Sequence, residues 1–251
     1  MKLIADTLLN RRTIRKYSDK PVDDKLLNDL LKMACRASTT GTMQVYSIVI
    51  NRDDEKKREL APWHFSQGMI TEAPVVLTFC ADFNRFNLWC RLRKAEPGYD
   101  NFISFMTAAI DALLVAQTFC VAAEAAGMGI CYLGTTTYNA HKIIDVLKLP
   151  KGVIPVTTLT LGWPDEKPEQ TDRLALEAIV HNETYHDYTD ESLEAFYREK
   201  EERTDSRQFV SENNKETLAQ VFTDIRYNKT DNIHFSNLLL EVLKDQGFME
   251  Q

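Results

Sequence analysis

Three patches of polar residues in this chain are suited to binding an anion. The first is Arg11-Arg12-Thr13-Ile14-Arg15, where guanidinium forks can bind phosphate oxygens in pairs and the Thr hydroxyl adds a neutral donor. The second is the hydroxyl-rich run Ser38-Thr39-Thr40-Gly41-Thr42, and the third is Arg173. Taken singly, the patches also fit a solvated helix end, a polar loop and a surface charge. Taken together, they could converge on one phosphorylated, polar cofactor.

The sequence shows no arrangement of side chains that is typical of a nucleophile, a metal site or an acid–base pair. The sequence has no G-x-S-x-G motif, and its 9 glycines form neither a dinucleotide-binding motif nor a phosphate-binding P-loop. His181 and His186 are expected to be surface residues rather than metal ligands. Asp53-Asp54 precedes a predicted helix and is expected to cap it rather than form a catalytic pair. This pattern favours an enzyme whose bound cofactor does the chemistry.

The composition predicts a soluble protein of a reducing compartment. Lys and Arg number 30 against 37 Asp and Glu, and the net charge of −7 argues against nonspecific nucleic-acid binding. The 5 cysteines include no Cys-x-x-Cys pair, which favours buried free thiols over disulfides or zinc. We find no leader-like N-terminus and no uncharged apolar run of about 18 residues. We therefore expect a cytoplasmic protein with neither a membrane nor a nucleic-acid partner.

The hydrophobic pattern predicts helices and four strands that carry these patches. A first helix is expected at 2–10, with Leu3, Ile4, Ala5, Leu8 and Leu9 facing inward. Further helices are predicted at 23–34, 53–60, 102–126 and 139–147, and strands at 45–50, 74–80, 128–133 and 153–161.

The predicted helix at 102–126 is unusual because Asp111 is its only charge between Phe102 and Ala123. Apolar residues occur on all its sides, and such a helix is central, either in a core or across a subunit interface. The strand at 74–80 is nearly continuously apolar and should be buried on both faces.

A change of role is expected near residue 190. Residues 190–251 carry 14 acidic and 8 basic residues and are predicted to form helices at 190–204, 215–225 and 235–246. We therefore divide the chain into a cofactor-binding domain, 1–189, and a helical C-terminal extension, 190–251. The extension is expected to pack on the same domain or on a partner subunit.

The chain resembles the nitroreductase family of flavoproteins. Arg11-Arg12-Thr13-Ile14-Arg15-Lys16-Tyr17 matches the family's opening signature [HR]-R-[ST]-x-R-x-[FY]. The other matching pieces are similar to the nitroreductase A and flavin reductase P branch; they are Ala37 to Gln44, Gln67, Phe79 to Arg85, Ala122 to Gly129, Tyr132 to Gly134, Leu149-Pro150 and Leu161 to Pro164. The matching pieces follow one another in the family's order from about residue 8 to 190. Each piece alone identifies the family only moderately well, but together, at the right separations, they identify it strongly.

The resemblance implies an α+β sandwich with a mainly antiparallel central sheet flanked by helices, in an intertwined homodimer that binds one FMN per subunit at the interface. It implies that Arg11, Arg12, Thr13 and Arg15 hold the FMN phosphate and one edge of the flavin ring. Ser38, Thr39 and Thr40 would come from the partner subunit, supported by Gln44. Gln67 would bind the pyrimidine edge, the backbone at Leu133, Gly134 and Thr135 would pass close to N5 and O4, and Arg173 would close on the phosphate.

Three departures from the family pattern bear on the cofactor site. Arg11 stands where this branch often has His, and Thr171 stands where it often has a Lys two residues before the Arg. Thr135-Thr136 follows Gly134, where relatives can have a second Gly. Arg11 could supply the charge that Thr171 lacks.

The reaction implied by the resemblance is two-electron reduction with NADPH or NADH as donor. Donor and acceptor would occupy the same place in turn, and the acceptor would be a nitroaromatic, a quinone or a flavin. Arg15 is the candidate for electrostatic stabilisation of the reduced flavin. The cations Arg198, Lys200, Arg203 and Arg207 could read the 2′-phosphate of NADPH, or could simply form solvated helix pairs. A flavoprotein of the same fold with another role stays open: reductive dehalogenation, flavin cleavage or flavin binding with little turnover.

Overall fold

The computed structural model describes residues 4–250, which form two compact units. The first unit consists of residues 1–169 and 235–251, and the second consists of residues 170–234. The boundary predicted at 189/190 lies inside the second unit, where the helix α8 begins. That prediction concerned a change of role, and it stays a prediction.

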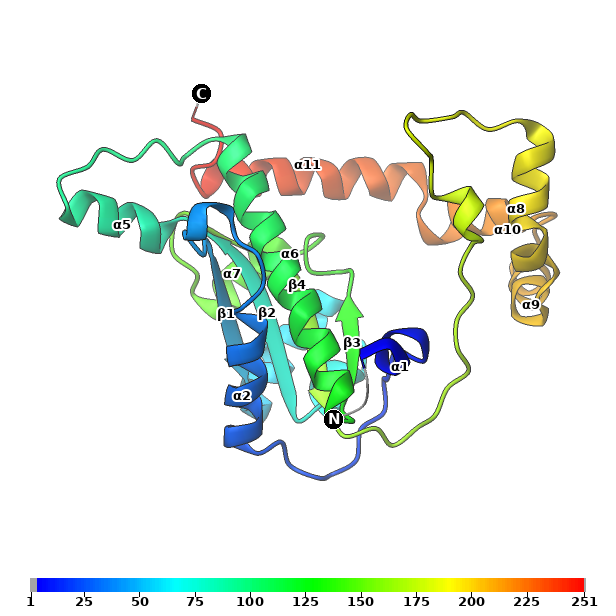
Figure 1. Cartoon of the computed structure of the whole chain (residues 1–251), viewed down its shortest axis with the longest axis horizontal. Helices are drawn as coiled ribbons and strands as arrows, with labels where there is room; N and C mark the ends of the chain where they lie inside the picture. Colours follow the sequence, from blue (N-terminus) through cyan, green and yellow to red (C-terminus); the bar gives the residue numbers. More distant parts are fainter. Residues whose placement is uncertain (1–3, 251) are drawn as a thin grey trace. The chain divides into compact units, whose positions relative to one another are not determined.

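The first unit is built on a four-stranded antiparallel sheet (Figure 1). Its strands are β1 (Tyr46–Asn51), β2 (Val75–Asp82), β3 (Gly129–Leu133) and β4 (Val153–Gly162). The spatial order is β1-β2-β4-β3, so β1 and β3 are the edge strands. All four predicted strands are confirmed to within two residues at each end. The α+β class and the antiparallel sheet are confirmed as well.

Helices cover both faces of this sheet. The helices of the first unit are α1 (Ile4–Leu9), α2 (Asp24–Ala34), α3 (Asp54–Leu60), α4 (Met69–Glu72), α5 (Asn84–Leu92), α6 (Phe102–Ala125) and α7 (Ala140–Leu147), with short 3₁₀ turns at η1 (Thr40–Thr42) and η2 (Ala61–His64). The helix cap predicted at Asp53 is confirmed at the start of α3. Asp53 accepts a hydrogen bond from the Lys56 backbone N–H at 2.9 Å, as expected for a helix start. The sequence pattern did not predict α4 and α5.

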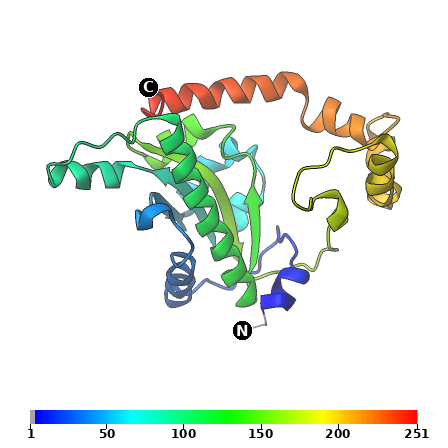
Figure 2. The same cartoon turned by 45° about the horizontal axis from the view of Figure 1, so that its top comes forward.

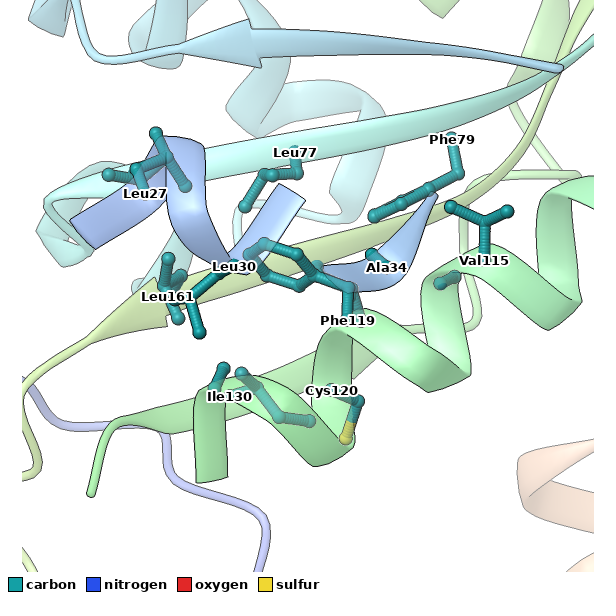
Figure 3. Packing of buried hydrophobic residues seen from close by; sticks show 14 of the residues in the cluster. Leu27, Leu30, Ala34, Leu77, Phe79, Val115, Phe119, Cys120, Ile130 and Leu161 are labelled. Atoms are coloured by element: carbon teal, nitrogen blue, oxygen red, sulfur yellow. The ribbon is translucent and has the colours of Figure 1, made fainter. Parts of the chain in front are cut away.

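The main core lies between one face of the sheet and the helices α2 and α6. Figure 3 shows Leu30 of α2, Phe119 of α6 and Leu77 of β2 meeting there. A second cluster, which includes Val76 and Ile143, fills the opposite face. Every residue of β2 is buried, as its continuous apolar run predicted, because helices cover both of its faces.

The long helix α6 lies across the sheet beside α2 and buries one side of its surface (Figures 1 and 2). Its other side is apolar and exposed within this chain; Ile103 is 70% exposed and Ile110 is 51% exposed. Among residues 4–250, α6 is the helix long and apolar enough to cross a membrane by length and composition alone. It is nevertheless a core helix, because half of that window is buried and Asp111 binds a neighbouring loop.

The interpretation of the first helix is wrong in part. Residues 1–3, including Leu3, lie outside the described residues. Ile4, Leu8 and Leu9 of α1 are exposed rather than inward, and so is Ala5, while Thr7 is the buried residue. Helical spacing identifies an apolar stripe, but it does not say whether the stripe is covered by the same chain.

The second unit is helical. Its elements are the 3₁₀ turn η3 (Leu176–Ala178), α8 (Asp190–Glu202), α9 (Thr204–Glu212), α10 (Leu218–Gln220) and the π-helix η4 (Val221–Arg226). The helix α11 (Lys229–Asp245) begins in this unit, and from Phe235 onward it belongs to the first. The sequence pattern predicted α8 and the α10–η4 stretch. It missed α9, and it placed the start of α11 six residues too late.

Candidate functional site

The N-terminal arginine loop, residues 11–17, lies along the free edge of the sheet. The Ile14 backbone N–H donates to the Ile130 carbonyl in β3 at 3.0 Å, and Tyr17 forms a β-bridge with Pro164 just beyond β4. Gly129 permits this approach, since a Cβ at that position would lie 2.6 Å from the Ile14 Cβ. The edge strand β3 therefore determines the position of the loop that carries Arg11, Arg12 and Arg15.

A carboxylate from the far end of β4 holds the same loop. Glu166 Oε1 accepts hydrogen bonds from the backbone N–H groups of Arg15, at 2.5 Å, and Lys16, at 3.0 Å. Thr13 is half-buried in the loop, and the Arg15 side chain is exposed. The backbone at Arg15 is thus fixed on both sides, and its charged side chain remains accessible to a ligand.

Arg11 and Arg12 differ in how their charges are satisfied. Arg11 Nη2 lies 3.3 Å from Oε1 of Glu124, at the C-terminal end of α6. The Glu124 side chain is only 9% exposed, and its burial, which outweighs the nearby Arg11, raises the pKa of Glu124. Arg12 donates through Nη1 to the Asn10 carbonyl at 2.8 Å and forms no ion pair within the described residues. Part of the Arg11 charge is therefore compensated inside the protein, whereas the charge of Arg12 is available.

A pocket of about 220 Å³ opens beside these two arginines. Its lining residues are Asp6, Thr7, Asn10, Arg11, Arg12, Ile14, Glu124, Gly127, Met128, Pro164, Glu166 and Lys167. The Nε atoms of both Arg11 and Arg12 are buried and have no hydrogen-bond partner in the described part of the chain. Donors left in this state indicate a place for an acceptor that the chain itself does not supply.

The hydroxyl-rich loop is held by the single charge in the middle of α6. Asp111 is 1% exposed, and its carboxylate accepts from Thr39 Oγ1 at 2.5 Å and from the Thr40 backbone N–H at 3.0 Å. Gln44 stabilises the same loop, because its backbone N–H donates to Thr39 Oγ1 at 2.9 Å. Ser38 is exposed at the start of the loop. A buried carboxylate needs such donors, so Asp111 determines where this loop lies.

These two patches do not meet within one chain. The hydroxyl-rich loop is bound to Asp111 and the arginine loop to Glu124, which stands thirteen residues further along α6. At ~1.5 Å of rise per residue, the two carboxylates are about 20 Å apart along the helix. One phosphate group cannot contact both patches of the same chain.

A third region joins the turn η2 to the end of β3. His64 Nδ1 lies 2.9 Å from Thr135 Oγ1, and Asn139 Nδ2 donates to the Trp63 carbonyl at 2.8 Å. His64 is fully buried, and this burial lowers its pKa to about 4, so the ring is neutral near pH 7. The predicted site residues Gln67 and Thr135 are therefore carried by loops that are bonded to each other.

Open space adjoins the loop that follows β3. Leu133 is buried at the end of the strand, and Gly134 is exposed. A Cβ at Gly134 would meet no atom within 4 Å. Gln67 is half-buried, with its backbone carbonyl bonded to the Ile70 N–H at 3.1 Å. A ligand lying along the free edge of β3 could thus reach from the arginine loop to this backbone.

Arg173 lies in the second unit. It is exposed, and its Nη1 donates to Thr171 Oγ1 at 2.9 Å and to the Asp172 carbonyl at 2.7 Å. Lys200, one of the cations considered for a 2′-phosphate, pairs with Asp172 at 2.8 Å. Arg203 pairs with Asp205 through two hydrogen bonds of 2.9 and 3.1 Å. Both cations are thus partly compensated by neighbouring carboxylates.

Four residues that fix this geometry are not identified as site residues by the sequence pattern: Asp111, Glu124, Glu166 and His64. Asp111 is the only charge between Phe102 and Ala123 of α6, and a lone charge in an apolar stretch is the signal that it binds something. Glu124 lies in the last turn of the same helix, and Glu166 follows the Gly-Trp-Pro turn; neither position has a spacing that marks it. His64 is one of 5 histidines in the sequence, and its spacing from the others marks no site.

The model of the Nitroreductase family matches residues 8–163. A curated relative named FMN reductase (NADPH), from Bacillus subtilis, is 34% identical over 76% of this chain and 78% of its own. The oxygen-insensitive NADPH nitroreductase of Salmonella typhimurium is 32% identical over 79% of this chain and 81% of its own.

Solved structures agree with this over nearly the whole chain. A protein of known structure from Bacteroides fragilis is 59% identical, with a TM-score of 0.97 over 98% of this chain and 100% of the other. The NfrA1 nitroreductase of Bacillus subtilis is 30% identical, with a TM-score of 0.86 over 99% of this chain and 100% of its own.

The buried His64 predicts a pH-dependent stability. Unfolded His64 titrates near its ordinary pKa of 6.5, but in the folded protein it does so at about 4, so the unfolded state binds more protons between these values. The free energy of unfolding should fall by up to about 3 kcal/mol from this residue as the pH drops from 6.5 to 4. Denaturant titrations across this range should show a shallower pH dependence for His64→Gln.

The exposed His186 provides the matched control, and His186→Gln should keep the wild-type slope. A slope for His64→Gln as steep as that of the wild type would contradict the assignment.

Proposed function

This chain belongs to the nitroreductase family, and from that premise we propose that it is an FMN-dependent NAD(P)H oxidoreductase. It reduces nitroaromatics, quinones or flavins by two electrons, with donor and acceptor using the same place in turn. The observation that carries the proposal is the arginine loop on the edge of β3, with two buried guanidinium nitrogens that lack partners in the described residues.

The residues at the site fit FMN. Arg12 and the exposed Arg15 form no ion pair with another described residue and can offer charge to the phosphate. Arg11 offers its buried Nε, which has no hydrogen-bond partner among the described residues. The open space at Gly134 lets the flavin ring approach backbone that a side chain would otherwise screen. FMN, when bound, supplies the two-electron chemistry, and the protein supplies binding and orientation.

Each residue of the proposed site has a stated role in FMN binding. Arg11, Arg12, Thr13 and Arg15 hold the phosphate and the adjoining ring edge, and Arg173 closes on the phosphate. Gln67 binds the pyrimidine edge, and the backbone of Leu133, Gly134 and Thr135 lies near N5 and O4. Arg15 also stabilises negative charge on the reduced ring.

A second copy of the chain completes the site. The hydroxyl-rich loop, Ser38 to Gln44, lies about 20 Å along α6 from the arginine loop of its own chain, so it serves the cofactor of a partner. The exposed apolar side of α6 supplies an interface. Its large exposed side chains are Phe102, Ile103, Met106, Ile110, Leu113 and Leu114. A continuous apolar surface of this kind marks a protein–protein contact.

Two further features belong to the same proposal. The enzyme acts in the cytoplasm, which is supported by the free cysteines. Its partners are small-molecule acceptors and a second copy of itself. A dehalogenating, flavin-cleaving or low-turnover flavoprotein of the same fold is the alternative that the experiments must separate.

Anaerobic titration with NADPH and NADH tests the function directly. The purified protein should be yellow, and its oxidised flavin band should bleach within the mixing time of at least one donor. Adding a quinone or a nitroaromatic should restore the band. A flavin band that neither donor bleaches would reject the reductase and leave a flavin-binding role.

The charges around the phosphate predict an order of importance. Arg12→Ala should lose FMN on gel filtration, because its charge has no carboxylate partner among the described residues. Arg173→Ala should weaken FMN binding by about ten- to a hundredfold, the scale of one charge-assisted contact. Thr171→Lys should bind FMN at least as tightly as the wild type. Arg58→Ala, at an exposed position of α3, is the control, and fluorescence titration of the apoprotein gives each dissociation constant.

If Arg12→Ala retained all of its FMN while Arg173→Ala lost it, the predicted order of importance of these two arginines would be contradicted.

The shared site predicts that dimerisation and FMN content are lost together. Ile110→Lys puts a charge on the exposed apolar side of α6 and should yield a monomer with little FMN, measured by light scattering and by absorbance. Ala95→Lys, in an exposed loop, should remain dimeric and yellow. A monomeric Ile110→Lys protein that retains its FMN would show that one chain suffices.

A further inference from the structure

Three aromatic rings, from the turn after η2, the turn before α7 and the helix α11, cluster near the loops proposed to bind the flavin. Tyr138 and Phe235 are stacked, with ring centroids 4.5 Å apart and planes 11° apart. Phe65 is tilted against both, at 6.4 Å from Tyr138 and 6.2 Å from Phe235. The stacked pair supports Phe65 from one side, and 53% of Phe65 remains exposed.

Phe65 is held in a backbone conformation that its side chain does not favour. Its φ is +54°, and the next residue, Ser66, has a φ of +53°. A bulky residue in the left-handed region is an outlier, and such strain is concentrated at functional sites. Two backbone hydrogen bonds hold it there, from the Phe65 N–H to the Pro62 carbonyl at 3.1 Å and from the Ser66 N–H to the Ala61 carbonyl at 2.8 Å. The turn thus keeps a large apolar ring at the surface.

The cluster is attached to both loops that the proposed function assigns to the flavin ring. Phe65 precedes Gln67 by two residues, and Tyr138 follows Thr135 by three. The hydrogen bond between His64 and Thr135 is 2.9 Å long, involves the fully buried His64 ring and joins the two loops next to Phe65 in the sequence. Any ring bound at Gln67 and Gly134 therefore has an aromatic surface close by.

We infer that the exposed face of Phe65, supported by the stacked Tyr138 and Phe235, is the surface on which a planar aromatic electron acceptor lies. This inference rests on the proposed function and adds a determinant of acceptor specificity. Aromatic rings prefer offset or tilted contacts with other rings, so Phe65 favours nitroaromatics and quinones over acceptors without a ring. His64 acts as a positioning residue, because it fixes the turn that presents Phe65.

The test compares acceptors with and without an aromatic ring in the FMN-loaded enzyme. Phe65→Leu keeps an apolar side chain and removes the ring. The ratio of the KM for menadione to the KM for ferricyanide should rise about three- to tenfold, the range expected for one aromatic pair. Phe65→Tyr should restore the wild-type ratio, and Ser66→Ala, a change in the same turn, should leave it as in the wild type.

A binding measurement gives a readout independent of turnover. Titration of the oxidised enzyme with 4-nitrobenzoate, without donor, perturbs the flavin spectrum, and its dissociation constant should rise by a similar factor in Phe65→Leu. An unchanged ratio and an unchanged dissociation constant would overturn the inference. A rise in the KM for NADPH alone would also overturn it, by assigning the surface to the donor. Bleaching of the wild-type flavin by NADPH is measured first, so failure of the proposed function is recognised separately.

Discussion

The two carboxylates of α6 determine where the polar loops of this protein lie. Taking a carboxylate out of water is unfavourable unless donors replace the lost hydration. Asp111 finds them in Thr39 and Thr40, and Glu124 finds one in Arg11. Both carboxylates lie on the side of α6 that is buried in this chain. A helix that looks purely structural thus holds two of the loops that we propose for FMN binding.

The free edge of β3 determines where the arginine loop lies. An edge strand exposes unpaired backbone groups, and here the arginine loop covers part of that edge through the Ile14 to Ile130 hydrogen bond. The loop ends beside β4, where Glu166 holds its backbone. At the other end of β3, the His64 to Thr135 bond arranges a second set of loops. One edge strand therefore positions both groups of residues that we propose for the flavin site.

The fold was predictable from the sequence where periodicity reflects burial within one chain. The strand β2 and the helix α6 are examples, since their apolar runs are long and unambiguous. The inward face assigned to α1 was wrong, because Ile4 and Leu9 are apolar and yet uncovered by their own chain. The arginine and hydroxyl patches were identified by residue type. Their separation, and the roles of Glu124, Glu166 and His64, depend on tertiary contacts that no local spacing encodes. The left-handed turn at Phe65 was equally hidden, because neither Phe65 nor Ser66 is a residue that usually signals such a turn.

The spacing of the two carboxylates also restricts how this sequence can change over evolution. Each residue added to an α-helix turns everything after it by about 100° and moves it by about 1.5 Å. A single insertion between Asp111 and Glu124 would therefore turn one carboxylate away from its loop. Insertions and deletions should therefore be excluded from this stretch of α6 and tolerated in the exposed segment 93–96 before it. The length of the helix is inherited together with the site that it positions.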